Sequence, residues 1–289
     1  EYTTQPADNA TFATAKAALL AGLNDTDATA ETRGTLPLSL KMVRTTTAAS
    51  TDLLLDTYTG AAAAYSVRKL DKDYTGYCMK VRRASDDAEA DIGFDGNGDL
   101  DTAAIATHCG ASSGFVSVWY DMSGNANNAT QSTSGSQPQI YNGTAVITEN
   151  GKPALDFDGD SIFVEHTPSS INLGTNDHYV SGVLTVGTNA NSNQVWLEEE
   201  GGSSNRYVFW WQNNDQTLQL YANSVIGSGT SSVKGDQYLL TGTRVGTTST
   251  LFKNGVSSLT GTAADFDSTG DLKIGTNVIE AGNQSWDGV

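Results

Sequence analysis

From Ser50 onward the chain consists of short β-prone runs separated by Gly, Asn, Asp and Ser. This pattern limits the possible folds more than any other feature of the sequence. Examples of these runs are GFVSVWYDM, YVSGVLTVG, RYVFWWQ, TLQLYA and QYLLTGTRV. Many short alternating strands joined by polar turns, with few helical patterns, are typical of an antiparallel sandwich or barrel. The sequence therefore predicts an all-β domain.

Three segments depart from this pattern of short strands. Residues 9–23 are Ala-rich with apolar residues at helical spacing, which predicts one short helix. The stretches AAAAYSVRKL (61–70) and LDTAAIATHCG (100–110) each suit a brief helix capped by polar neighbours. We therefore divide the chain into an N-terminal attachment segment, residues 1–50, and a β-domain, residues 51–289.

The charge of the chain excludes several partners. Asp and Glu number 33 against 16 Lys and Arg, a formal charge of −17. Such a surface repels phosphate backbones and anionic membranes, so we expect no nucleic-acid partner. No apolar run approaches the roughly 18 residues of a membrane span, so we expect no membrane insertion. The two cysteines, Cys78 and Cys109, fit either one bridge or two buried thiols.

The middle of the chain resembles a known family. The stretch AAAAYSVRKLDKDYTGYCMKVRRASDDAEADIGF, followed by DLDTAAIATHCG and FVSVWYDMSGNANNATQ, resembles the opening half of the fungal α-L-arabinofuranosidase B catalytic domain. Several motifs in the same order, over roughly residues 52–131, carry this resemblance. In the turn Tyr120-Asp121-Met122-Ser123-Gly124-Asn125, we expect the Asp and Asn side chains to bond backbone and to be structural.

The second half looks like a concanavalin A-like or laminin-G-like jelly roll. The motifs KPALDFDGDSIFVEH, LFKNGV, DLKIGTN and SWDGV occur in the order typical of that fold. Both resemblances imply a two-sheet antiparallel jelly-roll sandwich, here with a short N-terminal helical segment. Domains of this type continue beyond the last motif, so we expect that the final strand is absent or supplied from elsewhere.

The catalytic carboxylates of the arabinofuranosidase family are not matched. Its nucleophile lies in an Asp-x-Glu-Asn stretch, which aligns with residues 220–223, where only Asn223 is retained. Its acid/base follows an Ile-Gly-Gly turn, which aligns with residues 274–277, where Thr276 and Asn277 replace the acid. On this basis the sequence predicts a domain that is not an enzyme.

A second pair of carboxylates is an alternative catalytic site. In NQVWLEEEGG, Glu198 and Glu200 would share one face of a strand, about 7 Å apart, near the range of inverting glycosidases. The run ends at two glycines, as an exposed hairpin tip does. A solvated strand end, with Glu199 also exposed, is therefore the favoured interpretation.

Two acidic turns are candidate calcium sites. Asp95, Asn97, Asp99 and Asp101 alternate like the first ligands of a calcium loop. The later ligand positions of that pattern are missing, and Asp101 is equally suited to cap the following helix. The second candidate is Asp158 with Asp160. If calcium binds, it is expected to stabilise the domain.

Adjacent tryptophans suggest a ligand surface. Trp210 and Trp211 point to opposite faces of a strand, so one of them must face away from the core. That ring would be a sugar-stacking platform, or would be covered by another subunit. Asn223 is a further candidate for carbohydrate binding. Trp119 and Trp196 are expected to be packing residues.

Three functions follow from these observations. The first is a non-catalytic, lectin-like domain that binds a glycan or cell-surface polysaccharide, on an extracellular or virion-surface protein such as a phage tail fibre or capsid decoration. The second is a structural protein that assembles with copies of itself or with virion proteins. The third is a divergent glycoside hydrolase that uses Glu198 and Glu200.

Overall fold

The structure is a computed structural model, and it describes residues 52–159, 163–164, 171–187, 194–200, 206–212, 216–222, 225–265, 270–275 and 286–288. The chain divides into two units, Glu1–Ala49 and Ser50–Val289, and all described residues belong to the second. The helix predicted at residues 9–23, and the attachment segment as a whole, lie outside the described part.

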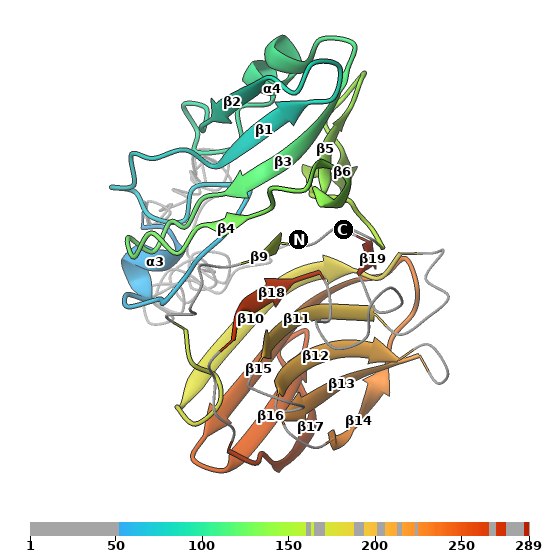
Figure 1. Ribbon diagram of the computed structural model, residues 1–289. Helices are drawn as coiled ribbons and strands as arrows, with labels where there is room; N and C mark the ends of the chain where they lie inside the picture. Colours follow the sequence, from blue (N-terminus) through green and yellow to red (C-terminus); the bar gives the residue numbers. More distant parts are fainter. Residues whose placement is uncertain are drawn as a thin grey trace, which may run out of the picture. The chain divides into compact units, whose positions relative to one another are not determined.

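All the named strand pairings are antiparallel, and they form two main sheets (Figure 1). The larger sheet contains, in order, β14 (Val225–Ser231), β13 (Thr217–Ala222), β12 (Arg206–Gln212), β11 (Gln194–Glu200), β18 (Leu272–Ile274), β9 (Phe163–Val164), β4 (Ala129–Thr130), β3 (Ser113–Trp119), β1 (Met79–Arg83) and β2 (Glu89–Ile92), with β5 (Gln139–Asn142) beside β3. The smaller sheet contains β10 (His178–Thr185), β15 (Gln237–Val245), β16 (Thr248–Lys253) and β17 (Val256–Thr262).

The remaining described elements are short. Two strand pairs complete the β-structure: β6 (Thr148–Glu149) with β7 (Lys152–Pro153), and β8 (Phe157–Asp158) with β19 (Asp287–Gly288). The helical elements are α3 (Leu54–Thr57), α4 (Thr102–Cys109) and the 3-10 turn η1 (Ser134–Ser136). The predicted all-β sandwich with few helices is confirmed.

The core of the sandwich lies between β11–β14 of the larger sheet and the smaller sheet (Figure 1). Trp196 and Phe209 reach across so closely that a Cβ at Gly182 would lie 2.2 Å from the Trp196 ring, and one at Gly242 would lie 2.1 Å from the Phe209 ring. Glycine at these two positions therefore lets the sheets approach. Trp119 and Trp196 pack against the core, as predicted.

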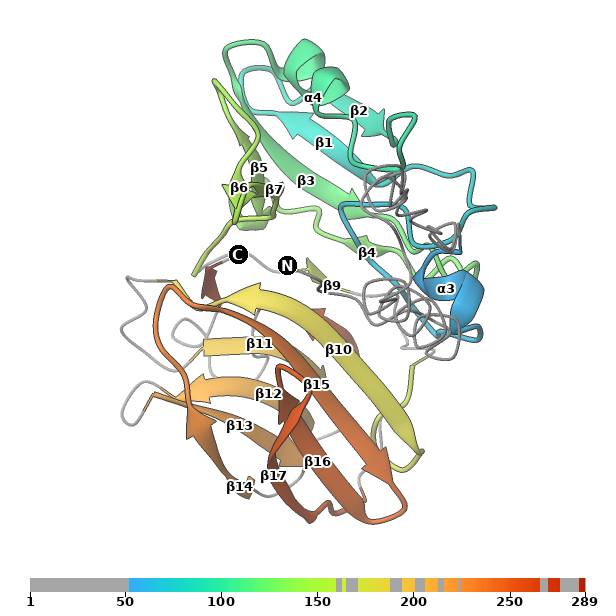
Figure 2. The ribbon, with the colours of Figure 1, turned by 180° about the vertical axis from the view of Figure 1, so that it is seen from behind.

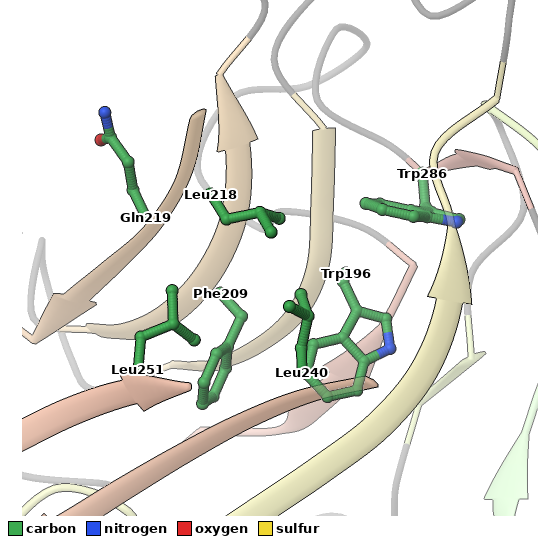
Figure 3. A pocket seen from close by; sticks show the side chains of 7 residues that line it. All are labelled: Trp196, Phe209, Leu218, Gln219, Leu240, Leu251 and Trp286. Atoms are coloured by element: carbon green, nitrogen blue, oxygen red, sulfur yellow. The ribbon is translucent and has the colours of Figure 1, made fainter. Parts of the chain in front are cut away.

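Figure 3 shows side chains at the centre of this core. The side chains of Trp196, Phe209, Leu218, Leu240, Leu251 and Trp286 meet between the sheets, whereas Gln219 points away from them. The space among them has no room for a water molecule. The interior is thus a packed core and not a ligand pocket.

Of the two helices predicted within the β-domain, one is present. Helix α4 forms at residues 102–109, and the Asp101 carboxylate caps it by accepting from the Ala104 N–H at 2.9 Å. The stretch 61–70 contains no helix, so that prediction is wrong. Its Ala64 N–H donates to Asp121 and its Ala64 carbonyl accepts from the Met122 N–H. Because these long-range bonds use its backbone groups, the alanine run stays non-helical despite its helix propensity.

Of the two states that the sequence allowed for the cysteines, the structure shows the second: Cys78 and Cys109 are free, buried thiols.

A half-buried histidine lies at one end of the sandwich. The His178 ring contacts Tyr207 edge-on, with centroids 4.8 Å apart, and His178 pairs in register with Arg244. Burial lowers the pKa of His178, and the nearby Arg244 acts in the same direction. The neutral imidazole is therefore the form that the fold accommodates.

This arrangement predicts an acid-sensitive stability. With the pKa of His178 lower in the folded than in the unfolded chain, the unfolded chain binds more protons just below the ordinary histidine value of about 6.5. Stability should therefore fall as the pH is lowered through that window. We expect a His178→Gln variant to lose less of its melting temperature than the parent between pH 7 and pH 5. A His108→Gln variant is the matched control, and equal pH dependence of the parent and His178→Gln would contradict the prediction.

Candidate functional site

The glutamate run on β11 lies within the larger sheet and not at an exposed tip. β11 is flanked by β12 on one side and β18 on the other. Glu198 and Glu199 are both 0% exposed. The interpretation of this run as a solvated strand end is therefore wrong. β12 and β18 flank the strand, and the side chains of Glu198 and Glu199 are covered by other parts of the chain.

Glu199 belongs to the inner face of the sheet. It pairs in register with Tyr207, whose ring packs on His178 of the smaller sheet. Its Oε2 atom accepts a hydrogen bond from the Leu173 N–H at 2.6 Å. Glu199 thus holds the segment before β10 against the sandwich, which is a structural role.

Glu198 lies on the opposite face, and the position of Glu200 lies on that same face. Glu198 pairs with Val208 on one side and Lys273 on the other, and the ladder continues without a bulge to Glu200. Residues two apart on a strand are about 7 Å apart on one face. The side chain of Glu200 lies outside the described part. This face is also covered, since Val208 is 0% exposed.

The positions that align with the family's catalytic nucleophile lie inside the sandwich. Leu220 and Ala222 of β13 are fully buried and pair with Phe209 and Tyr207. Apolar side chains at these two positions complete the core and supply no carboxylate. Asn223 lies outside the described residues, as do Thr276 and Asn277.

The register of β12 places the two tryptophans on different faces. Trp210 pairs with Val195 and Gln219, whereas Trp211 pairs with Leu218, a core residue. Position 210 is two residues from Val208, so it shares the face that carries Glu198. The tryptophan side chains themselves are outside the described part.

The first acidic turn uses its oxygens within the protein. Asp95 Oδ1 accepts from the Asn97 N–H at 2.8 Å and from the Asp99 N–H at 3.0 Å, and these bonds lower the pKa of Asp95. Asp101 caps α4, which is the alternative that the sequence offered. Among the described residues, no group of three or more His, Cys, Asp or Glu side chains is placed to hold a metal ion.

The second acidic turn is described only in part. Asp158 on β8 is exposed and pairs in register with Asp287, and Asp160 lies outside the described residues. Calcium binding at either turn stays a prediction.

A small polar cavity adjoins the turn that resembles the arabinofuranosidase motif. It has a volume of about 130 Å³ and is lined by Leu55, Thr59, Gly60, Ala61, Asp71 and Ser123. Five of these residues lie between residues 55 and 71 and Ser123 comes from a distant turn, so no local motif predicted the cavity. Asp71 is its one carboxylate, which is too few for the two-carboxylate chemistry of a glycosidase.

The comparison with known families shows which family the chain belongs to. The family model "Alpha-L-arabinofuranosidase B, catalytic" matches residues 51–215, more than half of the 289-residue chain. The chain belongs to the arabinofuranosidase B family. The match includes the whole of β11, and it ends before residues 220–223 and 274–277.

Solved arabinofuranosidases share the fold. An arabinofuranosidase complexed with arabinofuranosyl-α-1,2-xylobiose is 17% identical, with a TM-score of 0.62. A mutant of a GH54 α-L-arabinofuranosidase soaked with 4-nitrophenyl α-L-arabinofuranoside is 16% identical, also with a TM-score of 0.62. Each alignment covers 81% of this chain and 58% of the other, so the chain spans little more than half of the length of these enzymes. No curated protein matches the chain.

Membership of a catalytic family overturns one prediction. The domain was expected not to be an enzyme because residues 220–223 lack the family's carboxylates, but the family model that the chain matches is that of a catalytic domain. The family match lends no support to a phage fibre or capsid decoration. Within the described ranges, no helix is long and apolar enough to cross a membrane.

Proposed function

We propose that the chain is a glycoside hydrolase domain that cleaves terminal α-L-arabinofuranosyl linkages, with Glu198 and Glu200 as its two carboxylates. The observation that carries the proposal is the family match, which includes β11 with both glutamates. Membership supplies the kind of bond that is cleaved. The family's nucleophile is not matched at residues 220–223, so the carboxylates are sought on another strand.

The spacing of the pair supports an inverting reaction. Two positions on one face of a strand are about 7 Å apart, within the separation of roughly 6.5–9.5 Å that leaves room for a water molecule. One carboxylic acid protonates the glycosidic oxygen while the other carboxylate takes a proton from water. The water oxygen bonds to the anomeric carbon from the opposite face as the glycosidic C–O bond breaks, which releases arabinose and an alcohol.

The surroundings of the pair suggest how the sugar is held. In the strand register, position 210 shares a face of the sheet with Glu198, and an indole ring is suited to stack on a sugar. Asn223 follows β13, two strands away in the same sheet, and is the proposed polar contact. Because Glu198 is covered in the unliganded chain, substrate binding must displace what covers it.

The test is hydrolysis of 4-nitrophenyl α-L-arabinofuranoside by the full chain. We expect measurable release of nitrophenol, and a fall of about 100-fold in kcat for Glu198→Gln and for Glu200→Gln, because each variant keeps the shape of the side chain and removes its acid–base function. Nuclear magnetic resonance of the first product should show inversion at the anomeric carbon.

The control is Glu89→Gln, at an exposed position on β2, which should leave the rate unchanged. Melting temperatures identify any variant that fails to fold. The proposal would be contradicted if the parent chain showed no hydrolysis, or if both glutamate variants kept full activity. A product with retained configuration would exclude this pair, since its spacing requires inversion.

The setting of the protein stays a prediction. An extracellular location agrees with an enzyme that acts on plant or microbial polysaccharides. Assembly with copies of itself or with virion proteins follows from the sequence interpretation alone.

A further inference from the structure

The smaller sheet has one face in the core and one face in solvent, and the outer face has an unusual composition. Three neighbouring strands each direct two threonines to this side: Thr241, Thr243, Thr248, Thr250, Thr260 and Thr262. Thr241 is itself buried and lies within hydrogen-bond distance of the Ser181 hydroxyl, whereas the other five are partly or well exposed. We call the outer face of β10, β15, β16 and β17 the hydroxyl face. In Figure 2 the viewer looks toward this face, with β10, β15 and β16 in front. The alternate residues of the same strands, such as Leu240 and Leu251, are buried in the core.

The register arranges these threonines in rows. Thr243, Thr250 and Thr260 are aligned across three strands, and Tyr179 of β10 pairs with Thr243 at the end of the row. The Oγ1 atoms of Thr250 and Thr260 are 3.1 Å apart, within hydrogen-bond distance. Adjacent strands are about 4.8 Å apart, so the face presents hydroxyl groups at regular intervals.

Apolar groups are interspersed with the hydroxyls and are well exposed. Tyr179 is 68% exposed, Val183 63% and Val245 67%. Val183 pairs in register with Leu239, which is 42% exposed, so two exposed apolar side chains are adjacent across these strands. Exposed apolar groups that adjoin one another are typical of an interaction site.

The hydroxyl face carries no charge, in a chain with a formal charge of −17. The charged residues of these strands are directed elsewhere: the Lys253 ammonium lies over the inward-facing Tyr238 ring, and Arg244 is 1% exposed. A charged partner would find no complementary group here, whereas an uncharged ligand avoids the repulsion that the rest of the acidic surface produces.

The area of the face disfavours a second copy of the chain as its occupant. Four strands at about 4.8 Å spacing and about 25 Å in length give roughly 500 Å². A stable protein dimer buries about 800 Å² on each partner. A chain of sugar rings, by contrast, needs only a strip of the face, and it offers both apolar ring faces and hydroxyl groups.

We propose that the hydroxyl face binds a neutral polysaccharide chain. Tyr179 stacks on a sugar ring, and the threonine rows exchange hydrogen bonds with sugar hydroxyls. This site lies on the smaller sheet, whereas Glu198 and Glu200 lie on the larger one, so binding here does not depend on the proposed hydrolysis.

The experiment measures depletion of the full chain from solution by insoluble neutral polysaccharides, namely arabinoxylan, mannan and cellulose, with pectate as the anionic comparison. We expect binding to at least one neutral polymer, and none to pectate. Tyr179→Ala should weaken that binding about tenfold. The matched control is Tyr58→Ala, because Tyr58 is 69% exposed and lies outside the hydroxyl face. Both tyrosines are on the surface, so both variants should fold, which melting curves verify.

The outcomes separate this proposal from its rivals. Binding that is unchanged in Glu198→Gln but weakened about tenfold in Tyr179→Ala supports it, whether or not the chain hydrolyses arabinofuranosides. Equal binding by Tyr179→Ala and Tyr58→Ala, or no binding to any of the neutral polymers, overturns it. A dimer seen by light scattering that dissociates in Tyr179→Ala would also overturn it, in favour of a second copy.

Discussion

Replacing Arg244 by Met should destabilise the domain by about 3–5 kcal/mol, because its guanidinium is buried and serves several carbonyl groups at once. Arg244 is 1% exposed. Its Nη1 donates to the Gly174 carbonyl at 2.7 Å and to the Ala264 carbonyl at 3.3 Å, and its Nε donates to the Gly246 carbonyl at 3.0 Å. It also forms an ion pair with Asp265.

The size of this loss of stability follows from the hydrogen bonds of the guanidinium, which Met cannot form. Met fills a similar volume, so little of the loss arises from a cavity. The carbonyl oxygens of Gly174, Gly246 and Ala264 lose their donor, and a buried group without a partner costs about 1–3 kcal/mol. The segments on both sides of β15 lose their common anchor as well.

The measurement is the free energy of unfolding in denaturant, together with the melting temperature. At about 2–4 °C per kcal/mol for a domain of this size, the melting temperature should fall by about 10 °C. Arg68→Met is the control, at an exposed position, and should change stability by less than about 0.5 kcal/mol. A loss of less than about 1 kcal/mol in Arg244→Met would show that the buried guanidinium is not an anchor.

Replacing Asp121 by Ala should cost about 2–4 kcal/mol, because one buried carboxylate satisfies two separate parts of the chain. Asp121 is 4% exposed. Its Oδ1 accepts from the N–H groups of Ala64 and Ser123, both at 2.8 Å, and its Oδ2 accepts from the Ser123 hydroxyl at 2.7 Å and the Asn127 N–H at 3.0 Å. Ala leaves these donors without an acceptor.

The consequences of this change should be local as well as global. The alanine segment before β1 is held to the turn by Asp121 and by Asn125, whose side-chain amide donates to the Ala61 and Ala62 carbonyls. Amide hydrogen exchange at Ala64 should therefore accelerate in Asp121→Ala more than exchange in the smaller sheet. Asp73→Ala, where the side chain is 85% exposed, is the control and should be nearly neutral. Unchanged exchange at Ala64 would refute the anchoring role.

Much of the fold was predictable from local chemistry. Alternating apolar residues and turn formers predicted the antiparallel sandwich, and Asp101 before an Ala-rich run predicted the cap of α4. Order-specific motifs indicated the arabinofuranosidase resemblance, which the family match over residues 51–215 confirmed. The same motif argument failed for enzyme activity, because it examined only the positions of the family's own carboxylates, residues 220–223 and 274–277.

The errors arose where distant segments meet. Residues 61–70 have the propensity of a helix, yet their backbone bonds to Asp121 exclude it. The glutamates of β11 carry the signature of a surface strand, yet β12 and β18 flank them and bury Glu198 and Glu199 completely. Neither neighbour is visible in the local sequence, because strand order in a sheet depends on long-range pairing.

The sequence by itself determined the all-β class, the strand runs, the acidic surface and the family, since each depends on residues close together or on motif order. Only the tertiary structure decided which face each carboxylate occupies, which threonines form rows, and that Arg244 lies in the core. The physical reason is that strand register and burial are properties of several strands at once. A side chain's chemistry depends on the strands that surround it.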